Sequence, residues 1–139
     1  MSINASYHRR QIAAVLYLCD NCGEIVLDKL LILQLQKHFP HLQITVMVRG
    51  GEVLNDATMR DVRQIHLDEV CPCTSSQVPL AGCDLRHIGE DARALLASSD
   101  MIIAKGQANL NPFMAAACQS IICFYANATT SANGSGCTI

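Results

Sequence analysis

The chain has 139 residues, of which 50% are hydrophobic and 16% charged, and its net charge is −2. This composition excludes a disordered protein and favours one domain with a core on both faces of a sheet. The charge lacks the dense basic stripe of a nucleic-acid-binding protein, and no apolar run reaches the roughly 20 residues that span a bilayer. We therefore expect a cytoplasmic protein with no nucleic acid and no membrane partner.

Eight cysteines stand in the sequence. Because long aliphatic runs can build a core unaided, we interpret them as reduced thiols rather than as a disulfide framework. A C-x-x-C at 19–22 and a C-P-C at 71–73 leave a tetrathiolate zinc site as an alternative. We favour the reduced thiols, since the sequence does not show that the two pairs meet and Cys19 is expected to point into the packing of a strand.

The first predicted element is a strand. Residues 13–19 (AAVLYLC) form a short apolar run, typical of a buried parallel strand, that ends at the polar pair Asp20-Asn21. A helix follows and ends between residues 38 and 40. Its signature is leucine at a spacing of three and four, at Leu27, Leu30, Leu31 and Leu35.

The same order of elements then repeats. Residues 43–48 (QITVMV) predict a second strand, and residues 55–58 (NDAT) can cap a helix that runs to about Ile65. Residues 71–83 contain two prolines, two serines and a glycine, which predicts an irregular surface loop.

Residues 89–98 have helical character, and residues 101–104 (MIIA) predict another buried strand with a turn at 105–107 beyond it. Strands that alternate with helices predict an α/β fold with a parallel sheet. Ligands of such sheets bind beyond the carboxyl ends of the strands, so we expect the three loops that follow the strands to converge.

The residues in these loops suit a metal and a phosphate. Asp20, Asn21 and Asp56 offer hard oxygen donors of the kind that Mg²⁺ and Mn²⁺ prefer. Lys105 can face a phosphoryl group, and backbone N–H groups around Gly23 at a helix start can hold an anion. Each residue alone also fits an ordinary loop or helix start, and their shared position after strands favours the site.

Three stretches in order, 20–26 (DNCGEIV), 48–58 (VRGGEVLNDAT) and 103–107 (IAKGQ), resemble the DUF89 family of damage-control phosphatases, which includes acidic-residue methyltransferase-like proteins. The resemblance implies a three-layer α/β/α, Rossmann-like fold with a mainly parallel sheet. It also implies a metal-dependent phosphatase that hydrolyses phosphate monoesters of small phosphorylated metabolites.

By motif position, the resemblance makes Asp20, Asn21 and Asp56 the ligands of a divalent ion, which is manganese, cobalt, nickel or magnesium. Asp20 and Lys105 become the catalytic residues, and Asp20 either attacks phosphorus itself or only binds the metal. Lys105 contacts the substrate phosphate. The residues expected to bind substrate are Glu24, Arg49, Asn55 and Lys105.

Family members are longer than this chain, so we expect an incomplete domain. We divide it into a lead-in at 1–12, the α/β domain at 13–110 and an atypical tail at 111–139, without further sheet elements after 107. Read in the neighbouring frame, permitted codons spell the family's usual continuation, and we therefore hypothesise a frameshifted tail from about residue 111. Sheet surface left uncovered would expose apolar groups and permit an oligomer.

Two alternatives to a phosphatase remain open. The first is a non-catalytic, truncated fragment that binds metal or a partner. The second is a carboxyl methyltransferase, which we favour less because the sequence shows no glycine-rich G-x-G loop for a methyl donor.

Overall fold

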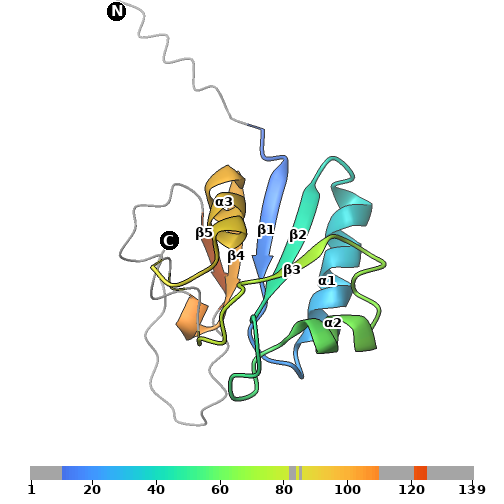
Figure 1. The fold of residues 1–139 in the computed structure, drawn as a ribbon. Helices are drawn as coiled ribbons and strands as arrows, with labels where there is room; N and C mark the ends of the chain where they lie inside the picture. Colours follow the sequence, from blue (N-terminus) through green and yellow to red (C-terminus); the bar gives the residue numbers. More distant parts are fainter. Residues whose placement is uncertain (1–10, 82–83, 85, 110–120, 125–139) are drawn as a thin grey trace, which may run out of the picture.

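The structure is a computed structural model that describes residues 11–81, 84, 86–109 and 121–124. Strands and helices alternate along this part of the chain (Figure 1). The strands are β1 (Ala14–Leu18), β2 (Gln43–Val48), β3 (Cys73–Ser75), β4 (Met101–Lys105) and β5 (Ile121–Phe124). The helices are α1 (Ile25–His38), α2 (Met59–Gln64) and α3 (Glu90–Ser98). The predicted α/β fold is confirmed.

The strands form one sheet in the order β3-β2-β1-β4-β5, and each neighbouring pair is parallel. In the centre, Leu16 of β1 lies opposite Thr45 of β2 and Ile102 of β4. The chain runs outward from β1 to β3 and then returns to β4 on the other side. The order therefore reverses between β1 and β4, and ligands of open parallel sheets bind at such a point, beyond the carboxyl ends of the strands.

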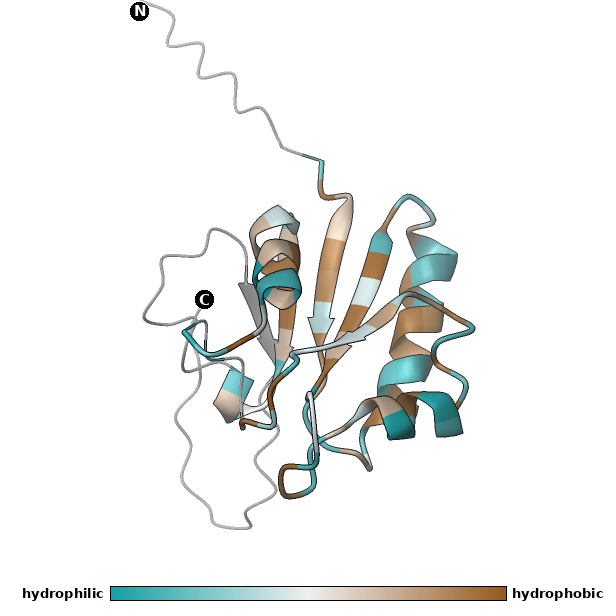
Figure 2. Cartoon of the chain, viewed as in Figure 1, coloured by the Kyte–Doolittle hydropathy of each residue, from teal (hydrophilic) through white to brown (hydrophobic). Residues whose placement is uncertain are grey.

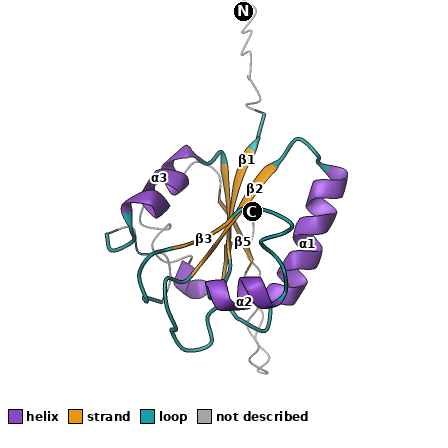
Figure 3. Cartoon of the chain, turned by 45° about the vertical axis from the view of Figure 1, so that its right-hand side comes forward, coloured by secondary structure: helices purple, strands orange, loops and turns teal. Residues whose placement is uncertain are grey.

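Helices cover both faces of the sheet, which gives three layers (Figure 3). On one face α1 and α2 pack against alternate residues of the strands, with Tyr17 and Val46 in the same buried cluster as Ile32. On the other face α3 packs against the remaining set, which includes Leu16 and Met47. Because every strand side chain from Val15 to Leu18 is buried, β1 reads as a continuous apolar run in the sequence.

The leucine spacing predicted α1 correctly, but most of those leucines do not face the sheet. The buried side chains of α1 are Ile25, Asp28 and Ile32. We also expected sheet surface to lie uncovered, whereas β1 is buried on both faces. The large apolar side chains that are exposed on α1 form a stretch coloured as hydrophobic in Figure 2, and they are Val26, Leu27, Leu30, Leu31 and Leu33.

Local sequence explains where α2 begins and how it is held. Thr58 and Asp61 form a capping box, in which the Asp61 carboxylate accepts hydrogen bonds from the Thr58 N–H at 2.8 Å and hydroxyl at 2.9 Å. At the other end of α2, Lys29 of α1 donates to the carbonyl oxygen of Ile65 at 2.6 Å. The C-terminal end of α2 is thus held against α1.

Two expectations about the later part of the chain are wrong. Residues 71–83 are not wholly irregular, because β3 pairs with β2 from Val46 to Val48. Strand β5 extends the sheet beyond β4, although no element was expected after residue 107. The rest of the tail lies outside the described residues, so the hypothesis about its reading frame stays a prediction. Among the helices described, none has the length and apolar character needed to cross a membrane.

Candidate functional site

Backbone hydrogen bonds join the loop after β1 to the loop after β2 at the carboxyl edge of the sheet. The Ala57 N–H donates to the carbonyl oxygen of Asp20 at 2.7 Å. Asn21 and Asp56 form an isolated antiparallel bridge between the same loops. The three residues predicted as metal ligands therefore lie on two loops that are bonded to each other.

The loop after β4 reaches the same place through Gly106. Its φ of 79° is a left-handed conformation that glycine adopts without strain. A Cβ at this position would lie 2.1 Å from Oδ2 of Asp20, so a side chain would displace the carboxylate. Asn109 follows and donates from Nδ2 to the carbonyl oxygens of Cys19 at 3.0 Å and Lys105 at 2.7 Å. The loops after β2 and β4 thus both contact the loop after β1, as expected.

The carboxylate of Asp20 lies in surroundings that disfavour its charge. Burial raises its pKa, and the negative charge of Asp56 raises it further. Arg49 and Lys105 lower the pKa of Asp20, but the net shift is upward. A carboxylate that is partly buried beside another carboxylate is stabilised by a cation, so the pair suits a positive ligand.

Arg49 lies beside this pair and is buried, with 2% of its surface exposed. Its Nε donates to Oδ2 of Asp56 at 2.7 Å. Its Nη2 is buried without a hydrogen-bond partner in the described part of the chain. A buried guanidinium nitrogen that lacks a partner costs free energy, and an anionic oxygen would satisfy it.

In the turn before α1, groups that were expected to bind ligands form hydrogen bonds within the protein. The Asn21 side-chain oxygen accepts a hydrogen bond from the Gly23 N–H at 2.7 Å, and the Glu24 N–H donates to the Asn21 carbonyl at 3.1 Å. The expected anion cradle around Gly23 is therefore wrong for these two amides, which are already bonded. Asn55 contributes its backbone carbonyl, which accepts from the Cys22 N–H at 2.8 Å, while its side chain is exposed.

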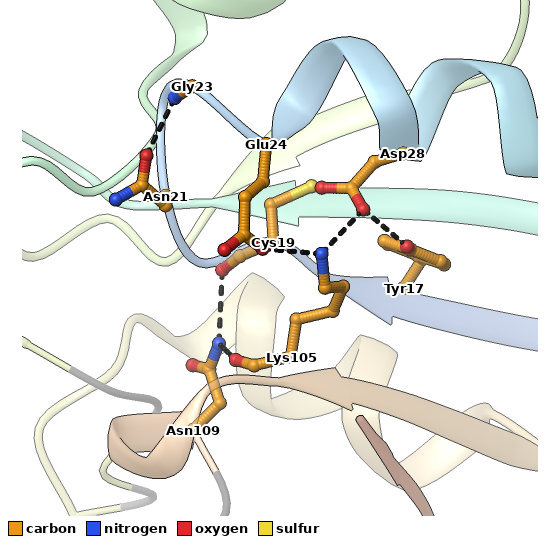
Figure 4. Close-up of polar contacts among 8 residues, drawn as sticks. All are labelled: Tyr17, Cys19, Asn21, Gly23, Glu24, Asp28, Lys105 and Asn109. Atoms are coloured by element: carbon orange, nitrogen blue, oxygen red, sulfur yellow. Dashed lines mark hydrogen bonds and ion pairs between the residues drawn. The ribbon is translucent and has the colours of Figure 1, made fainter. Parts of the chain in front are cut away.

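Lys105 ends β4 and forms two ion pairs with α1 and the residue before it (Figure 4). Its Nζ donates to Oε2 of Glu24 at 2.6 Å and to Oδ1 of Asp28 at 2.9 Å. The Tyr17 hydroxyl, from β1, donates to the same Asp28 oxygen at 2.7 Å. Lys105 was expected to face a phosphoryl group, and in this structure it faces two carboxylates.

These contacts fix the protonation of the cluster. Burial lowers the pKa of Lys105, but the hydrogen bonds and charges of Glu24 and Asp28 outweigh burial, and the net effect raises it. Burial raises the pKa of Tyr17, and Asp28 raises it further, so the hydroxyl keeps its proton and donates. Burial and Asp28 likewise raise the pKa of Cys19 well above its usual range. Lys105 is charged, and the thiol and the phenol are neutral.

Sequence reasoning missed Asp28, Tyr17 and Asn109. One signal could have found Asp28, which follows Glu24 by four residues and thus lies on the same face of the helix. Tyr17 and Asn109 carry no such signal, because an aromatic residue in a strand and an amide after a turn are common.

Among the residues that the structure describes, there is no group of three or more His, Cys, Asp or Glu side chains that could hold a metal ion. This finding includes both cysteine pairs, at 19–22 and 71–73, which are free thiols. The zinc alternative is therefore not supported. The metal ligands that the sequence predicts include only two carboxylates, Asp20 and Asp56, with Asn21 as an amide donor.

Comparisons with known proteins agree on one relationship. The sequence model of the "Damage-control phosphatase ARMT1-like domain" matches residues 4–126. An uncharacterised protein of Methanocaldococcus jannaschii is 34% identical over 100 residues, which are 72% of this chain and 32% of that protein. A damage-control phosphatase of Archaeoglobus fulgidus is 30% identical over 112 residues, which are 78% of this chain and 38% of that one.

The fold agrees as well. The crystal structure of a DUF89 family protein from Pyrococcus horikoshii superposes with a TM-score of 0.80 at 23% identity, over 87% of this chain and 42% of that chain. The chain thus spans about a third of the length of these curated relatives and less than half of the solved structure.

Proposed function

The chain belongs to the damage-control phosphatase ARMT1-like domain family, and we propose that it is the metal-binding and phosphate-binding part of a metal-dependent phosphatase for small phosphorylated metabolites. The observation that carries this proposal is that the loops of Asp20 and Asp56 are hydrogen-bonded to each other, while Lys105 at the end of β4 lies near enough to lower the pKa of Asp20. The name of the Archaeoglobus fulgidus relative, a damage-control phosphatase, supports the same reaction class.

The donors present fit a hard divalent cation. Asp20 and Asp56 supply carboxylates, and Asn21 supplies an amide oxygen with a second lone pair beyond its bond to Gly23. Such a set suits manganese or magnesium, which bind few protein oxygens, and also cobalt or nickel. The raised pKa of Asp20 supports the assignment, because the carboxylate lacks a full counter-charge.

The positive groups of the site would hold the substrate. Arg49 offers a buried Nη2 without a partner, and Lys105 has one N–H beyond those given to Glu24 and Asp28. Both can bind phosphoryl oxygens and stabilise the charge that spreads over them as the ester bond breaks. Asn55 has an exposed side chain on the adjoining loop and can contact the rest of the metabolite.

Asp20 orients the reacting centre, since Gly106 and the bond from Ala57 fix its place. A bound divalent ion would supply polarisation of the phosphoryl group and a nucleophile at neutral pH. The residues of this chain would supply its ligands and the phosphate contacts.

The test is hydrolysis of a generic phosphate ester with and without Mn²⁺, Co²⁺ or Mg²⁺, comparing the wild type with Asp20→Ala and Asp56→Ala. We expect metal-stimulated turnover that both substitutions abolish. The matched control is Glu69→Gln, an exposed acid after α2. Turnover that needs no metal and survives both substitutions would refute the site.

A second candidate function is a non-catalytic chain that binds metal or a partner. The observation in its favour is that Lys105, the expected phosphate contact, is already paired with Glu24 and Asp28. Calorimetry separates the two candidates. Binding of Mn²⁺ that depends on Asp20, without hydrolysis of any tested ester, would support the second one.

A further inference from the structure

We propose that Glu24 is a displaceable counter-ion of Lys105 that holds the place taken by a substrate phosphoryl group, whereas Asp28 is the fixed counter-ion that keeps Lys105 in position. The inference rests on the proposed function, because it concerns how Lys105 meets a phosphate. It gives Glu24 a role other than direct contact with substrate, and it gives a role to Asp28, which lies two residues beyond the stretch 20–26 that carries the family resemblance.

Lys105 has three N–H donors and gives two of them to carboxylates, at 2.6 Å to Glu24 and 2.9 Å to Asp28. A phosphate dianion that accepted the third donor would approach both carboxylates. Like charges at such distances repel each other strongly where water is scarce. One carboxylate must therefore move away when the phosphate binds.

The two carboxylates differ in their freedom to move. The side chain of Glu24 is 40% exposed, so water can solvate it once it leaves Lys105. The side chain of Asp28 is 3% exposed and lies on the face of α1 that packs on the sheet. If Asp28 lost Lys105, a charge would remain buried without a counter-ion, which is far more costly than exposing a glutamate. Glu24 is the one that yields.

Asp28 is also held from the sheet side. The Tyr17 hydroxyl donates to the oxygen that accepts from Lys105, and burial raises the pKa of Tyr17 so that the hydroxyl stays a donor. Tyr17 belongs to β1 and Lys105 to β4, so Asp28 links the two strands at the point where the strand order reverses. Tyr17 and Asp28 are positioning residues in this arrangement, because they act on the phosphate through Lys105.

The first test measures the affinity for inorganic phosphate by calorimetry in saturating Mg²⁺. Glu24→Gln removes the competitor and is expected to tighten binding about twofold to fivefold, the range of a partly exposed ion pair. Tyr17→Phe changes no charge but loosens Asp28, and is expected to weaken binding about twofold to tenfold. Glu90→Gln, an exposed acid in the first turn of α3, is the matched control and should leave the affinity unchanged.

The second test observes Lys105 directly. The chain has three lysines, so the signals of ¹³Cε,¹⁵Nζ-labelled lysine are easily assigned by NMR. In Glu24→Gln the Lys105 signal should stay distinct, because Asp28 still holds it. In Asp28→Asn it should move toward the signal of the exposed Lys37.

The outcomes separate this inference from the proposed function. Opposite effects of Glu24→Gln and Tyr17→Phe on phosphate affinity support the inference. Weaker binding in Glu24→Gln overturns it while leaving phosphate binding intact. A wild type that binds no phosphate refutes the proposed function. The lysine signals still show whether Asp28 or Glu24 is the fixed counter-ion of Lys105. If the Lys105 signal moves toward that of Lys37 in Glu24→Gln and stays distinct in Asp28→Asn, Glu24 is the fixed counter-ion and the inference is overturned.

Discussion

Replacing Gly106 by alanine tests whether Asp20 is part of a cation site. The φ of Gly106 is 79°, and a left-handed conformation costs an alanine roughly 1–2 kcal/mol. The stiffer unfolded chain offsets roughly 0.4–1 kcal/mol of that cost. We therefore expect Gly106→Ala to lose only about 1 kcal/mol of stability, or roughly 3 °C in Tm for a chain of this size.

Its effect on metal binding should be much larger than its effect on stability. The new Cβ would lie 2.1 Å from Oδ2 of Asp20, whereas ordinary contacts begin at 3.4 Å, so the carboxylate must move by more than an ångström. Changes in the surroundings of a metal ligand typically weaken metal affinity by roughly 10–100-fold, and we expect a loss in that range. Calorimetric titration with Mn²⁺ measures the affinity, and thermal unfolding followed by circular dichroism measures the stability.

The control adds the same methyl group at a glycine away from the site. In Gly89→Ala the new Cβ would clash with the side chain of Gln77, including its Cβ, so this variant also introduces a clash but leaves Asp20 untouched. This variant should bind Mn²⁺ as the wild type does. If Gly106→Ala also binds Mn²⁺ with unchanged affinity, the argument that Asp20 is a ligand at this position is refuted.

Three further predictions concern stability. Burial and the charge of Asp56 raise the pKa of Asp20, so the folded state loses stability when this carboxyl ionises. In the absence of metal, Asp20→Asn should therefore have a higher Tm than the wild type at pH 7. The difference in Tm should vanish below about pH 4, where the wild-type carboxyl is protonated. Equal Tm values across that pH range would contradict this. Lys105→Met leaves the buried Asp28 without a cation and should cost about 3–5 kcal/mol in urea unfolding, and Lys105→Met combined with Asp28→Leu should recover part of it. Thr58→Ala removes the capping box of α2 and should cost about 1 kcal/mol in the same assay; a loss below a few tenths would show that the cap is dispensable.

The central strands were predictable because their sequences reflect their burial. β1, β2 and β4 are apolar runs bounded by polar residues. β3 was missed because its three residues, Cys-Thr-Ser, are half-buried and too short to show a period. The helix α1 was predicted from a leucine stripe that is largely exposed, so the correct element was inferred from residues that do not face the core.

The sequence predicted which loops form the site, but not which side chains pair within it. The order of polar residues after strands placed Asp20, Asp56 and Lys105 at one edge, since parallel strands end on the same side. The pairing of Lys105 with Asp28 spans 77 residues of sequence and follows from β4 lying beside β1, which no local pattern encodes. The partner of Arg49, Asp56, is only seven residues away, but their pairing depends on the fold of the irregular loop between them, which has no period to reveal it.

The charges of the site imply an order of binding. The site has a net formal charge of −2, because it contains four carboxylates and two cations. A phosphate dianion that arrived first would be repelled, whereas a divalent cation between Asp20 and Asp56 would cancel the excess. By linkage, a cation that tightens phosphate binding is itself bound more tightly once phosphate is present. Glu24 would then act at the end of the cycle, because a carboxylate that competes for Lys105 weakens the hold on product phosphate and speeds its release.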